Sequence, residues 1–194
     1  MEPETIVTVL WGLFILSWAA SAAWAERSSA RMSLGPLTRL YVAGAMAAAV
    51  LAVVHLAMPG MRERLWPAQP LLDWPLTIVC ALGLAFCWWA RLHIGKLWSA
   101  GVDRKEGHRV VDSGPYGWVR HPIYSGVIVA ALAFALVRAR PSGMLLALLF
   151  AVFFSLKARK EEEFLREELG DAYDAYRTKV GRLVPGVGLR PSRP

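Results

Sequence analysis

Two groups of polar side chains lie beside long apolar stretches, and their residue types suit the binding of a charged ligand. The first group is Arg120, His121 and Tyr124, at the start of an apolar run. The second is the acidic run Glu161 to Glu163, which follows another apolar run. Arginine binds carboxylates through paired hydrogen bonds, carboxylates bind ammonium groups, and aromatic faces attract cations. Together the two groups suit a zwitterionic ligand, provided that the fold brings them to one place.

Each group taken alone also has a simpler explanation. Arg120 and His121 can be positive charges at a membrane surface, and Pro122 then stands at the first position of a helix, where its missing N–H costs nothing. Glu162 and Arg166 have the i, i+4 spacing of an ion pair on a solvated helix face. The elements that position the groups therefore decide between these interpretations.

The composition of the chain predicts an all-α integral membrane protein. Of its 194 residues, 56% are hydrophobic and 19% are charged, which is too apolar for an ordinary soluble domain. Four apolar blocks are long enough to cross a bilayer, and a break at 138–143 divides the last of them into a helical hairpin. We therefore expect about five transmembrane helices in the blocks Ile6 to Ala25, Leu40 to Met58, Trp74 to Ala90 and Ile123 to Leu156.

Basic residues in the connections predict how the chain lies in the membrane. Lysine and arginine are retained on the cytoplasmic side of short loops, and their number alternates between low and high along the successive connections. This pattern predicts an outside N-terminus and a cytoplasmic C-terminus, in the inner membrane if the source is bacterial. The net charge of +7 is then mostly a topology signal, and no soluble basic domain is left to bind nucleic acid.

The predicted hairpin sets the two polar groups opposite one another. Its first arm would leave the cytoplasmic surface at Ile123, and its second arm would return to that surface near Leu156. Arg120 and His121 would then face the segment 157–163 across the mouth of the hairpin. The two groups would lie on one side of the membrane and at one depth.

The second arm of the hairpin is predicted to project beyond the membrane. A helix over 141–169 has no internal breaker, and at about 1.5 Å per residue it exceeds the hydrocarbon core of about 30 Å. Gly170 ends this helix, and Asp171 can cap a short following helix that carries Tyr173 and Tyr176 on one face. We expect this short helix to fold back on the protein or on the lipid headgroups.

If the fold brings both polar groups to one depth, S-adenosylmethionine is a ligand whose charges match their side chains. Its amino group requires a carboxylate, its carboxylate requires arginine or backbone N–H groups, and its sulfonium tolerates an aromatic face. The sequence has no glycine-rich strand-to-helix motif of the Rossmann type, so helices and loops must bind this ligand. The histidines lack metal-ligand spacing, and we predict no metal site.

The segments that carry these groups resemble a known family. They are GKLWS at 95–99, GHRVVDSGPYGWVRHPIYSG at 107–126 and EEEFLREELGDAYDAYRTKVGRLVP at 161–185. In this order they are similar to the C-terminal half of the isoprenylcysteine carboxyl methyltransferase family, which belongs with the membrane phospholipid methyltransferases. The resemblance covers about half of the chain, and the combination of RHPxY, EExxLxxxxG and spaced tyrosines before a proline is specific.

The resemblance implies a multispan enzyme that uses S-adenosylmethionine to methylate a lipophilic substrate near the cytoplasmic surface. It implies that the segment with His108 lines the adenine pocket and that the tail with Tyr173, Tyr176 and Arg182 closes the site. Leu169 departs from the phenylalanine that is common in the family at that position. The cofactor-binding positions that the resemblance implies are His108, Val110, Val111, Tyr116, Arg120, His121, Pro122, Tyr124, Glu161 and Glu162.

Arg120 and Glu162 are the residues we expect to be catalytic. Methyl transfer from a sulfonium requires alignment of the reacting atoms and exclusion of water. A carboxylate acceptor is already ionised, and a spare arginine such as Arg120 can position it, whereas a thiol or amine acceptor would need deprotonation.

These expectations divide the chain into a scaffold and a catalytic part. Residues 1–90 would form a transmembrane scaffold of three spans, and residues 91–194 one integrated catalytic unit. The expected reaction is carboxyl O-methylation of an isoprenylcysteine-like group, with a lipophilic small molecule or lipidated substrate and membrane lipids as partners. An isoprenoid acid, a small thiol and a lipid amine remain open as acceptors. Two other functions also remain open: an NADPH-dependent membrane reductase of the sterol type and a non-enzymatic membrane accessory protein.

Overall fold

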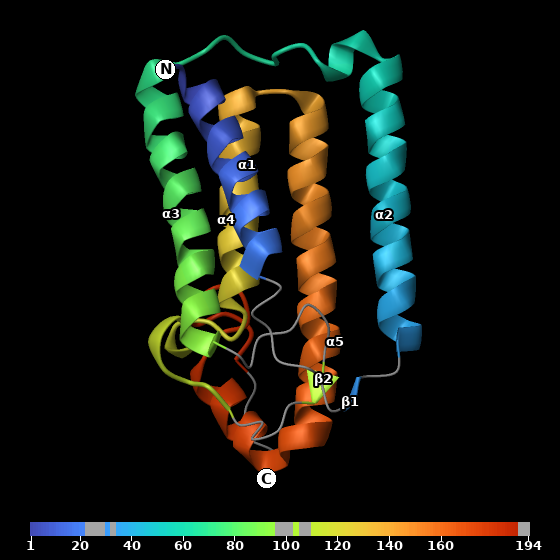
Figure 1. Ribbon diagram of the computed structural model, residues 1–194, viewed down its shortest axis with the longest axis vertical. Coiled ribbons are helices and arrows are strands. Elements are labelled where there is room, and N and C mark those ends of the chain that lie inside the picture. Colours follow the sequence, from blue (N-terminus) through green and yellow to red (C-terminus); the bar gives the residue numbers. More distant parts are fainter. Residues whose placement is uncertain (22–29, 32–33, 96–102, 105–109, 190–194) are drawn as a thin grey trace.

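A computed structural model describes residues 1–21, 30–31, 34–95, 103–104 and 110–189, and this part of the chain forms a bundle of five helices (Figure 1). The helices are α1 (Pro3–Ser21), α2 (Leu34–Ala57), α3 (Pro70–Ile94), α4 (Pro122–Arg138) and α5 (Pro141–Lys179). The other described elements are the 3-10 turns η2 (Pro59–Met61) and η4 (Gly114–Gly117) and the strands β1 (Ala30–Arg31) and β2 (Asp103–Arg104).

The expected all-α membrane fold is confirmed. Among the described residues, α1, α2, α3 and α5 are long and apolar enough to cross a membrane, and α4 is a shorter apolar helix of 17 residues. A turn at Ala139 and Arg140 joins α4 to α5, as the predicted hairpin requires. The chain is therefore an integral membrane protein whose last two helices form a hairpin.

The C-terminal boundary of α3 differs from its prediction. This helix continues through Ile94, so Arg91 lies in its last turn rather than in the following connection. The Arg91 side chain is fully buried and donates hydrogen bonds to the carbonyl oxygens of Gly95, at 2.7 Å, and Ser21, at 3.1 Å. Arg91 thus satisfies carbonyl groups at the ends of two helices, which otherwise lack helical partners.

The two short strands were not predicted. β1 pairs with β2 in antiparallel fashion, with Ala30 opposite Arg104 and Arg31 opposite Asp103. The pairing ties the connection between α1 and α2 to the connection between α3 and α4. Two residues are too few to show the alternating pattern from which strands are recognised in a sequence.

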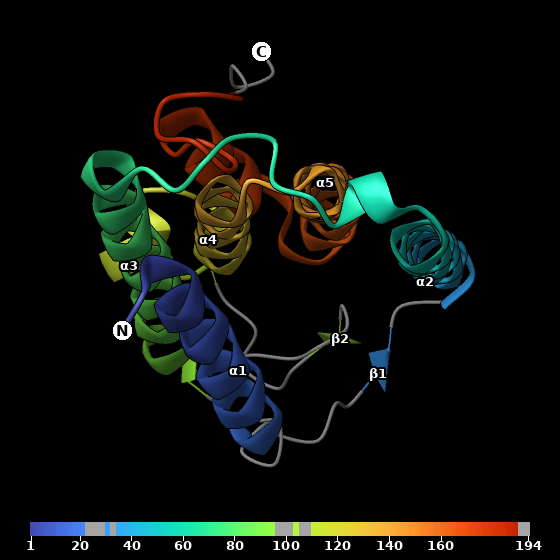
Figure 2. The same ribbon diagram turned by 90° about the horizontal axis from the view of Figure 1, so that it is seen from above.

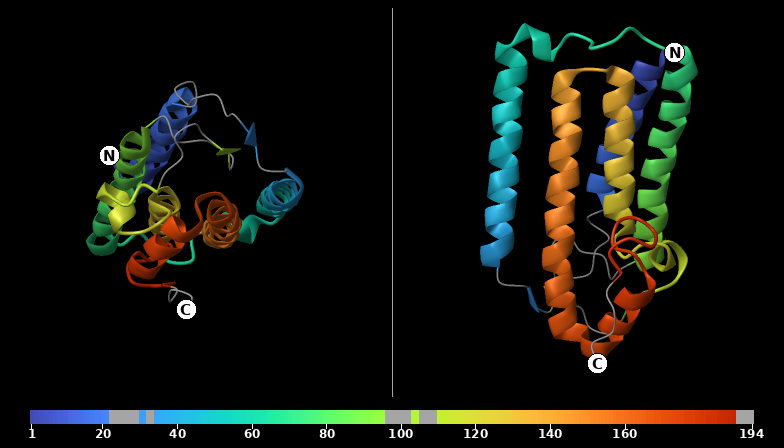
Figure 3. Two further views of the ribbon diagram at one scale, coloured as in Figure 1. Left: turned by 90° about the horizontal axis from the view of Figure 1, so that it is seen from below. Right: turned by 180° about the vertical axis from the view of Figure 1, so that it is seen from behind.

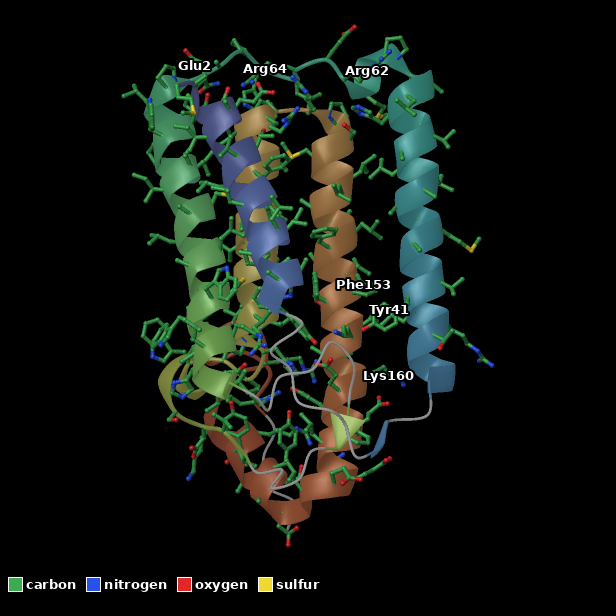
Figure 4. The ribbon with its side chains drawn as sticks, viewed as in Figure 1. Glu2, Tyr41, Arg62, Arg64, Phe153 and Lys160 are labelled. Atoms are coloured by element: carbon green, nitrogen blue, oxygen red, sulfur yellow. The ribbon has the colours of Figure 1, made fainter. Side chains whose placement is uncertain are left out.

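The helices surround α4 on three sides. It packs against α3, α5 and α1, whereas α2 stands at the edge of the bundle and packs against α5 (Figure 2). Tyr41 of α2 and Phe153 of α5 point toward one another with their ring centroids 5.7 Å apart (Figure 4). The main buried cluster comes from α1, α3 and α4 and consists of Val7, Phe14, Cys80, Leu84, Cys87, Val127, Ala130, Ala133 and Val137.

Two glycines allow α3 and α4 to approach closely near the mouth of the hairpin. A Cβ atom on Gly126 would lie 2.5 Å from both the Cys87 sulfur and the Gly83 carbonyl oxygen. A Cβ atom on Gly83 would in turn lie 2.9 Å from the Gly126 carbonyl oxygen. Both distances are below van der Waals contact, so this crossing fixes where α4 begins relative to α3.

The part of α5 beyond the bundle bends back on itself, as predicted. Gly170 interrupts the helix with φ 52° and ψ −130°, a conformation that side chains strongly disfavour. The second arm of α5 then runs back toward the bundle, and the tail that follows lies against the bases of α3 and α4 (Figure 3). Its residues Tyr173, Tyr176 and Val180 form a buried cluster with Val110.

Candidate functional site

The backbone before α4 is held by the tail that follows α5. The amide of Arg120 donates to the Gly181 carbonyl at 2.8 Å, and the amide of His121 donates to the Arg182 carbonyl at 3.1 Å. Pro122 then begins α4 at the position where its ring suits a helix start. The residues of the RHPxY motif are therefore positioned jointly by α4 and by the tail.

The guanidinium of Arg120 joins α4, α5 and the tail. Its Nε donates to Glu162 Oε1 at 2.8 Å, and the Arg120 side chain is only 1% exposed. Its Nη1 donates to the carbonyl oxygens of Arg177 and Val180, and its Nη2 donates to the Gly188 carbonyl at 3.3 Å. The expectation of a spare guanidinium at Arg120 was wrong, because each of its three nitrogens already donates within the protein.

Glu162 is the carboxylate at which these segments converge. Its Oε2 accepts a hydrogen bond from Arg182 Nη2 at 2.9 Å, and its side chain is 3% exposed. Arg177 Nε lies 3.9 Å from the same oxygen. The predicted surface pair of Glu162 with Arg166 is wrong, because the folded-back arm offers Asp174 to Arg166 at 2.9 Å. Glu162 is thus buried and surrounded by guanidinium groups.

Glu161 has a different set of partners from its neighbour. The Tyr124 hydroxyl donates to Glu161 Oε1 at 2.6 Å, and Lys157 Nζ lies 3.5 Å from the same oxygen. Lys157 Nζ also lies over the Tyr124 ring, 5.1 Å from its centroid, and over the Tyr41 ring, 5.7 Å from its centroid. Lys157 and Tyr41 were not among the predicted site residues, although the i, i+4 spacing of Lys157 and Glu161 was visible in the sequence.

His121 bridges the two carboxylates. Its Nδ1 lies 3.5 Å from Glu161 and its Nε2 lies 3.5 Å from Glu162, while its ring stacks on Tyr124 with centroids 5.4 Å apart. Burial by itself lowers the pKa of His121, but the hydrogen bonds and negative charges of the two glutamates outweigh that effect and raise the pKa above its ordinary value of 6.5. The protonated imidazolium is therefore the form that this environment favours.

Tyr116, of the predicted set, is joined to the site through the folded-back arm. The Tyr176 hydroxyl donates to the Tyr116 carbonyl at 2.5 Å, and the Tyr116 ring stacks on His93 with centroids 6.3 Å apart. Burial raises the pKa of the Tyr116 phenol, with smaller contributions from nearby Tyr176 and Glu161, so the phenol stays neutral. Tyr116 therefore helps to dock the arm and presents no charge.

The remaining predicted positions lie nearby or outside the described residues. Val110 packs against the cluster of Tyr173 and Tyr176, and Val111 is half-buried beside it in the chain. His108 lies outside the described residues. The structure thus brings Arg120, His121, Tyr124, Glu161 and Glu162 into one network.

The arrangement has the chemistry of a binding site for a charged ligand at the surface of a membrane. Two buried carboxylates, an imidazole, a phenol and several cationic groups meet just beyond the apolar parts of α4 and α5. Fold and network together define a helical integral membrane protein with a buried polar centre at one end of its spans.

Residues 76–167 match the sequence model of the isoprenylcysteine carboxyl methyltransferase family. This segment begins within α3 and includes the RHPxY motif, the hairpin and both glutamates. The family resemblance drawn from the motifs is therefore confirmed for the part of the chain that carries the site.

Individual relatives are similar over less than half of the chain. The protein-S-isoprenylcysteine O-methyltransferase of Schizosaccharomyces pombe is 36% identical over 83 residues, which are 42% of this chain and 35% of the relative. The methanethiol S-methyltransferase of a Pseudomonas strain is 37% identical over 70 residues, which are 36% of this chain and 26% of the relative. The chain thus matches well under half of the length of these relatives.

A solved structure shares the fold over a larger part of the chain. The eukaryotic intramembrane Ras methyltransferase ICMT aligns with a TM-score of 0.55 at 23% identity, covering 82% of this chain and 56% of that one. At this identity the likeness shows the helical fold, including helices outside the segment of the family match.

Proposed function

We propose that this protein is an S-adenosylmethionine-dependent methyltransferase acting on a lipophilic substrate at the cytoplasmic membrane surface. We further propose carboxyl O-methylation of an isoprenylcysteine-like group as its reaction. The observation that carries the proposal is the buried network in which Arg120 and His121 meet Glu161 and Glu162. The name of the Schizosaccharomyces pombe relative, which is 36% identical over 83 residues, supports the reaction class.

The residues of the network fit the proposed cofactor. Glu161 can accept hydrogen bonds from an ammonium group, and the stacked rings of His121 and Tyr124 offer aromatic faces near it. His121 Nε2 is buried and lies 3.5 Å from Glu162 without a well-formed hydrogen bond, so the carboxylate of a ligand placed beside it could accept its N–H. The half-buried Val110 and Val111 supply an apolar surface suited to a planar base.

The proposed reaction requires alignment of the reacting atoms and exclusion of water more than it requires acid or base groups. When bound, S-adenosylmethionine would supply an electrophilic methyl group on a positively charged sulfur. Arg120 fixes the start of α4 relative to the tail, and Glu162 keeps Arg120 and Arg182 in place. Tyr173 and Tyr176 close the tail side of the site against water. Arg120 thus acts in this proposal as a positioning residue, and a carboxylate acceptor needs no base.

An apolar groove beside the motif suits a lipophilic acceptor. It has a volume of about 460 Å³ and lies between the middle of α3, the first turns of α4 and the tail. Phe86, Trp118 and Leu183 line it, and the Ser125 hydroxyl holds the tail there by donating to the Leu183 carbonyl at 2.7 Å. An isoprenoid chain can lie in this groove from the membrane side.

The same proposal includes the placement of the chain and its division. The distribution of basic residues supports an outside N-terminus and a cytoplasmic site, in the inner membrane if the source is bacterial. Residues 1–90 would serve as scaffold, and residues 91–194 as the catalytic unit.

Binding of the cofactor product tests the proposal directly. Calorimetry with S-adenosylhomocysteine in detergent micelles should show binding to the unchanged protein and none to Glu162→Gln or Arg120→Ala. Tyr124→Phe, which removes one hydrogen bond of 2.6 Å, should weaken binding by about tenfold, because a hydrogen bond to a charged group contributes about 1.5–3 kcal/mol.

Glu163→Gln is the matched control, because Glu163 is the next residue but is 60% exposed and pairs with Lys160. It should bind the product with unchanged affinity. Equal affinity in Glu162→Gln, Arg120→Ala and the unchanged protein would overturn the site assignment. Competition by NADPH instead would favour a reductase, and absence of methyl turnover with every acceptor would favour an accessory protein.

A small thiol is the second candidate acceptor. It is favoured by the Pseudomonas relative, whose name states S-methylation of methanethiol. A transfer screen with labelled S-adenosylmethionine should compare a prenylcysteine analogue, an isoprenoid acid, a small thiol and a lipid amine. We expect the prenylcysteine analogue to be the best acceptor, and preference for the thiol would identify the alternative.

A further inference from the structure

A second hollow lies on the other side of Glu162, between the two arms of α5 and the tail. Its volume is about 400 Å³, and it is separate from the apolar groove. Its lining consists of charged side chains: Arg159, Glu162, Glu163, Arg166, Arg177 and Arg182. We call it the arginine pocket.

Positive charge exceeds negative charge in the arginine pocket. Four of its six lining residues are arginines and two are glutamates. Glu163 is bound by Lys160 at 2.8 Å, outside the lining, and Glu162 is bound from behind by Arg120. Both carboxylates are thus shared with cations that do not line the pocket. Asp174, also outside the lining, pairs with Arg166 at 2.9 Å and with Arg177 at 2.8 Å. The excess positive charge therefore rests on Arg159 and on Arg182, which shares Glu162 with Arg120.

Several nitrogen atoms of this pocket have hydrogen atoms left to donate. The Nε atoms of Arg177 and Arg182 are buried and have no hydrogen-bond partner among the described residues. The Arg177 side chain is only 9% exposed, and its Nε is 3.9 Å from Glu162, too far for a hydrogen bond. Within the described part of the chain, no carboxylate lies within ion-pair distance of Arg159. Buried donors without acceptors are costly, and an anion in the pocket would satisfy them.

We infer that the arginine pocket binds a phosphate group. Guanidinium groups converge on the hollow from the first arm of α5, from its second arm and from the tail. A tetrahedral oxyanion can accept from several directions at once, whereas a planar carboxylate accepts mainly in its own plane. The pocket begins one helical turn beyond the apolar part of α5, so phospholipid headgroups and dissolved phosphate can both reach it.

The arginine pocket shares Glu162 and Arg182 with the network around the proposed cofactor site, but Arg159 and Arg166, which also line it, take no part in the proposed reaction. Glu161, Tyr124 and His121 do not line it. Arg159 and Arg166 belong to the arginine pocket and are absent from the network around Glu161. A test of anion binding therefore needs neither cofactor nor turnover, and its failure would leave the methyltransferase proposal untouched.

Thermal unfolding of the purified full chain in maltoside micelles measures the binding. Sodium phosphate should raise the melting temperature relative to sodium chloride at equal ionic strength, with saturation. In Arg159→Gln the half-saturating phosphate concentration should rise about fivefold, as expected for loss of one charge-assisted hydrogen bond partly exposed to water.

Lys179→Gln is the matched control, because it removes one exposed positive charge from the second arm of α5, and Lys179 does not line the pocket. Its half-saturating concentration should stay within about twofold of the unchanged protein, since an exposed charge acts only weakly at a distance. A second arm replaces phosphate by micelles containing phosphatidic acid, with phosphatidylcholine as the reference lipid.

Each outcome decides the inference. Stabilisation by phosphate alone identifies a soluble phosphate compound as the ligand, and stabilisation by phosphatidic acid alone identifies a lipid headgroup. The inference is overturned if neither stabilises the protein beyond chloride or phosphatidylcholine. It is also overturned if Arg159→Gln and Lys179→Gln respond equally, because the effect would then be general charge screening.

Discussion

The two ends of the bundle combine carboxylate and guanidinium groups in opposite ways. At the end that carries the N-terminus, Glu4 of α1 pairs with Arg140 at 2.8 Å, Arg64 at 2.9 Å and Arg138 at 3.4 Å. The exposed fractions of these four side chains lie between 24% and 29%. Figure 4 shows Arg64 at this end, above the helices. This cluster links α1 to the hairpin and to the connection before α3, where water can reach it.

At the other end the same residue types are withdrawn from water. Glu162 is 3% exposed and Arg120 is 1% exposed. This difference shows that burial, and not the number of ion pairs, distinguishes the candidate functional site from an ion-pair cluster that only links helices. A half-exposed pair contributes little and tolerates loss of a partner, whereas a buried charge requires every partner.

Removing the central carboxylate at each end should give the largest contrast. Glu162→Ala leaves the buried Arg120 without its charged partner, and should lower the free energy of unfolding by about 3–5 kcal/mol. Glu4→Ala should cost about 1 kcal/mol or less, because its arginines remain hydrated. Reversible denaturation in mixed micelles measures both values. Similar losses at the two ends would break the comparison.

Gly170→Ala should have the next largest effect, confined to the end with the site. A Cβ atom there meets nothing within 4 Å, so the only penalty is the backbone conformation at φ 52° and ψ −130°. That penalty is of order 1–3 kcal/mol. We expect weaker docking of the second arm of α5, measured as faster amide exchange at Tyr173 and Tyr176. Gly12→Ala, also without a neighbour within 4 Å, is the control and should leave this exchange unchanged.

The smallest of the three expected contrasts between the two ends is in how stability depends on pH. Because the folded protein raises the pKa of His121 above 6.5, protonated His121 adds stability that is complete below the pKa of the unfolded chain. This contribution is lost as the pH rises through the folded pKa. The melting temperature of the unchanged protein should therefore fall as the pH rises from about 6.5 through the folded pKa, and His121→Gln should flatten that fall. Glu4→Gln should not change the slope, and a slope unaffected by His121→Gln would contradict the prediction.

The sequence predicted the elements that depend on local composition. Apolar length gave the spans, and Gly170 marked the end of the long arm because no other residue type tolerates its backbone conformation. The meeting of the RHPxY motif with the glutamates followed from the hairpin alone. These features could be predicted because each is encoded in a contiguous segment.

The partners of Arg120 could not be predicted in the same way. Three of its four acceptors are backbone carbonyls in the tail and at the end of α5, and any residue type offers a carbonyl. The contacts of Lys157 in the site were not predicted for another reason. A lysine at the end of a span is already expected from the topology of a membrane protein, so its presence did not indicate a site.

The position of those carbonyls sets an order of events during synthesis. The acceptors of Arg120 in Arg177, Val180 and Gly188 follow it by 57, 60 and 68 positions along the chain. While α4 enters the membrane, these residues have not yet emerged from the ribosome. Arg120 must therefore remain hydrated at the surface until the tail emerges, and each newly made molecule passes through an interval in which α4 is inserted and the site does not yet exist.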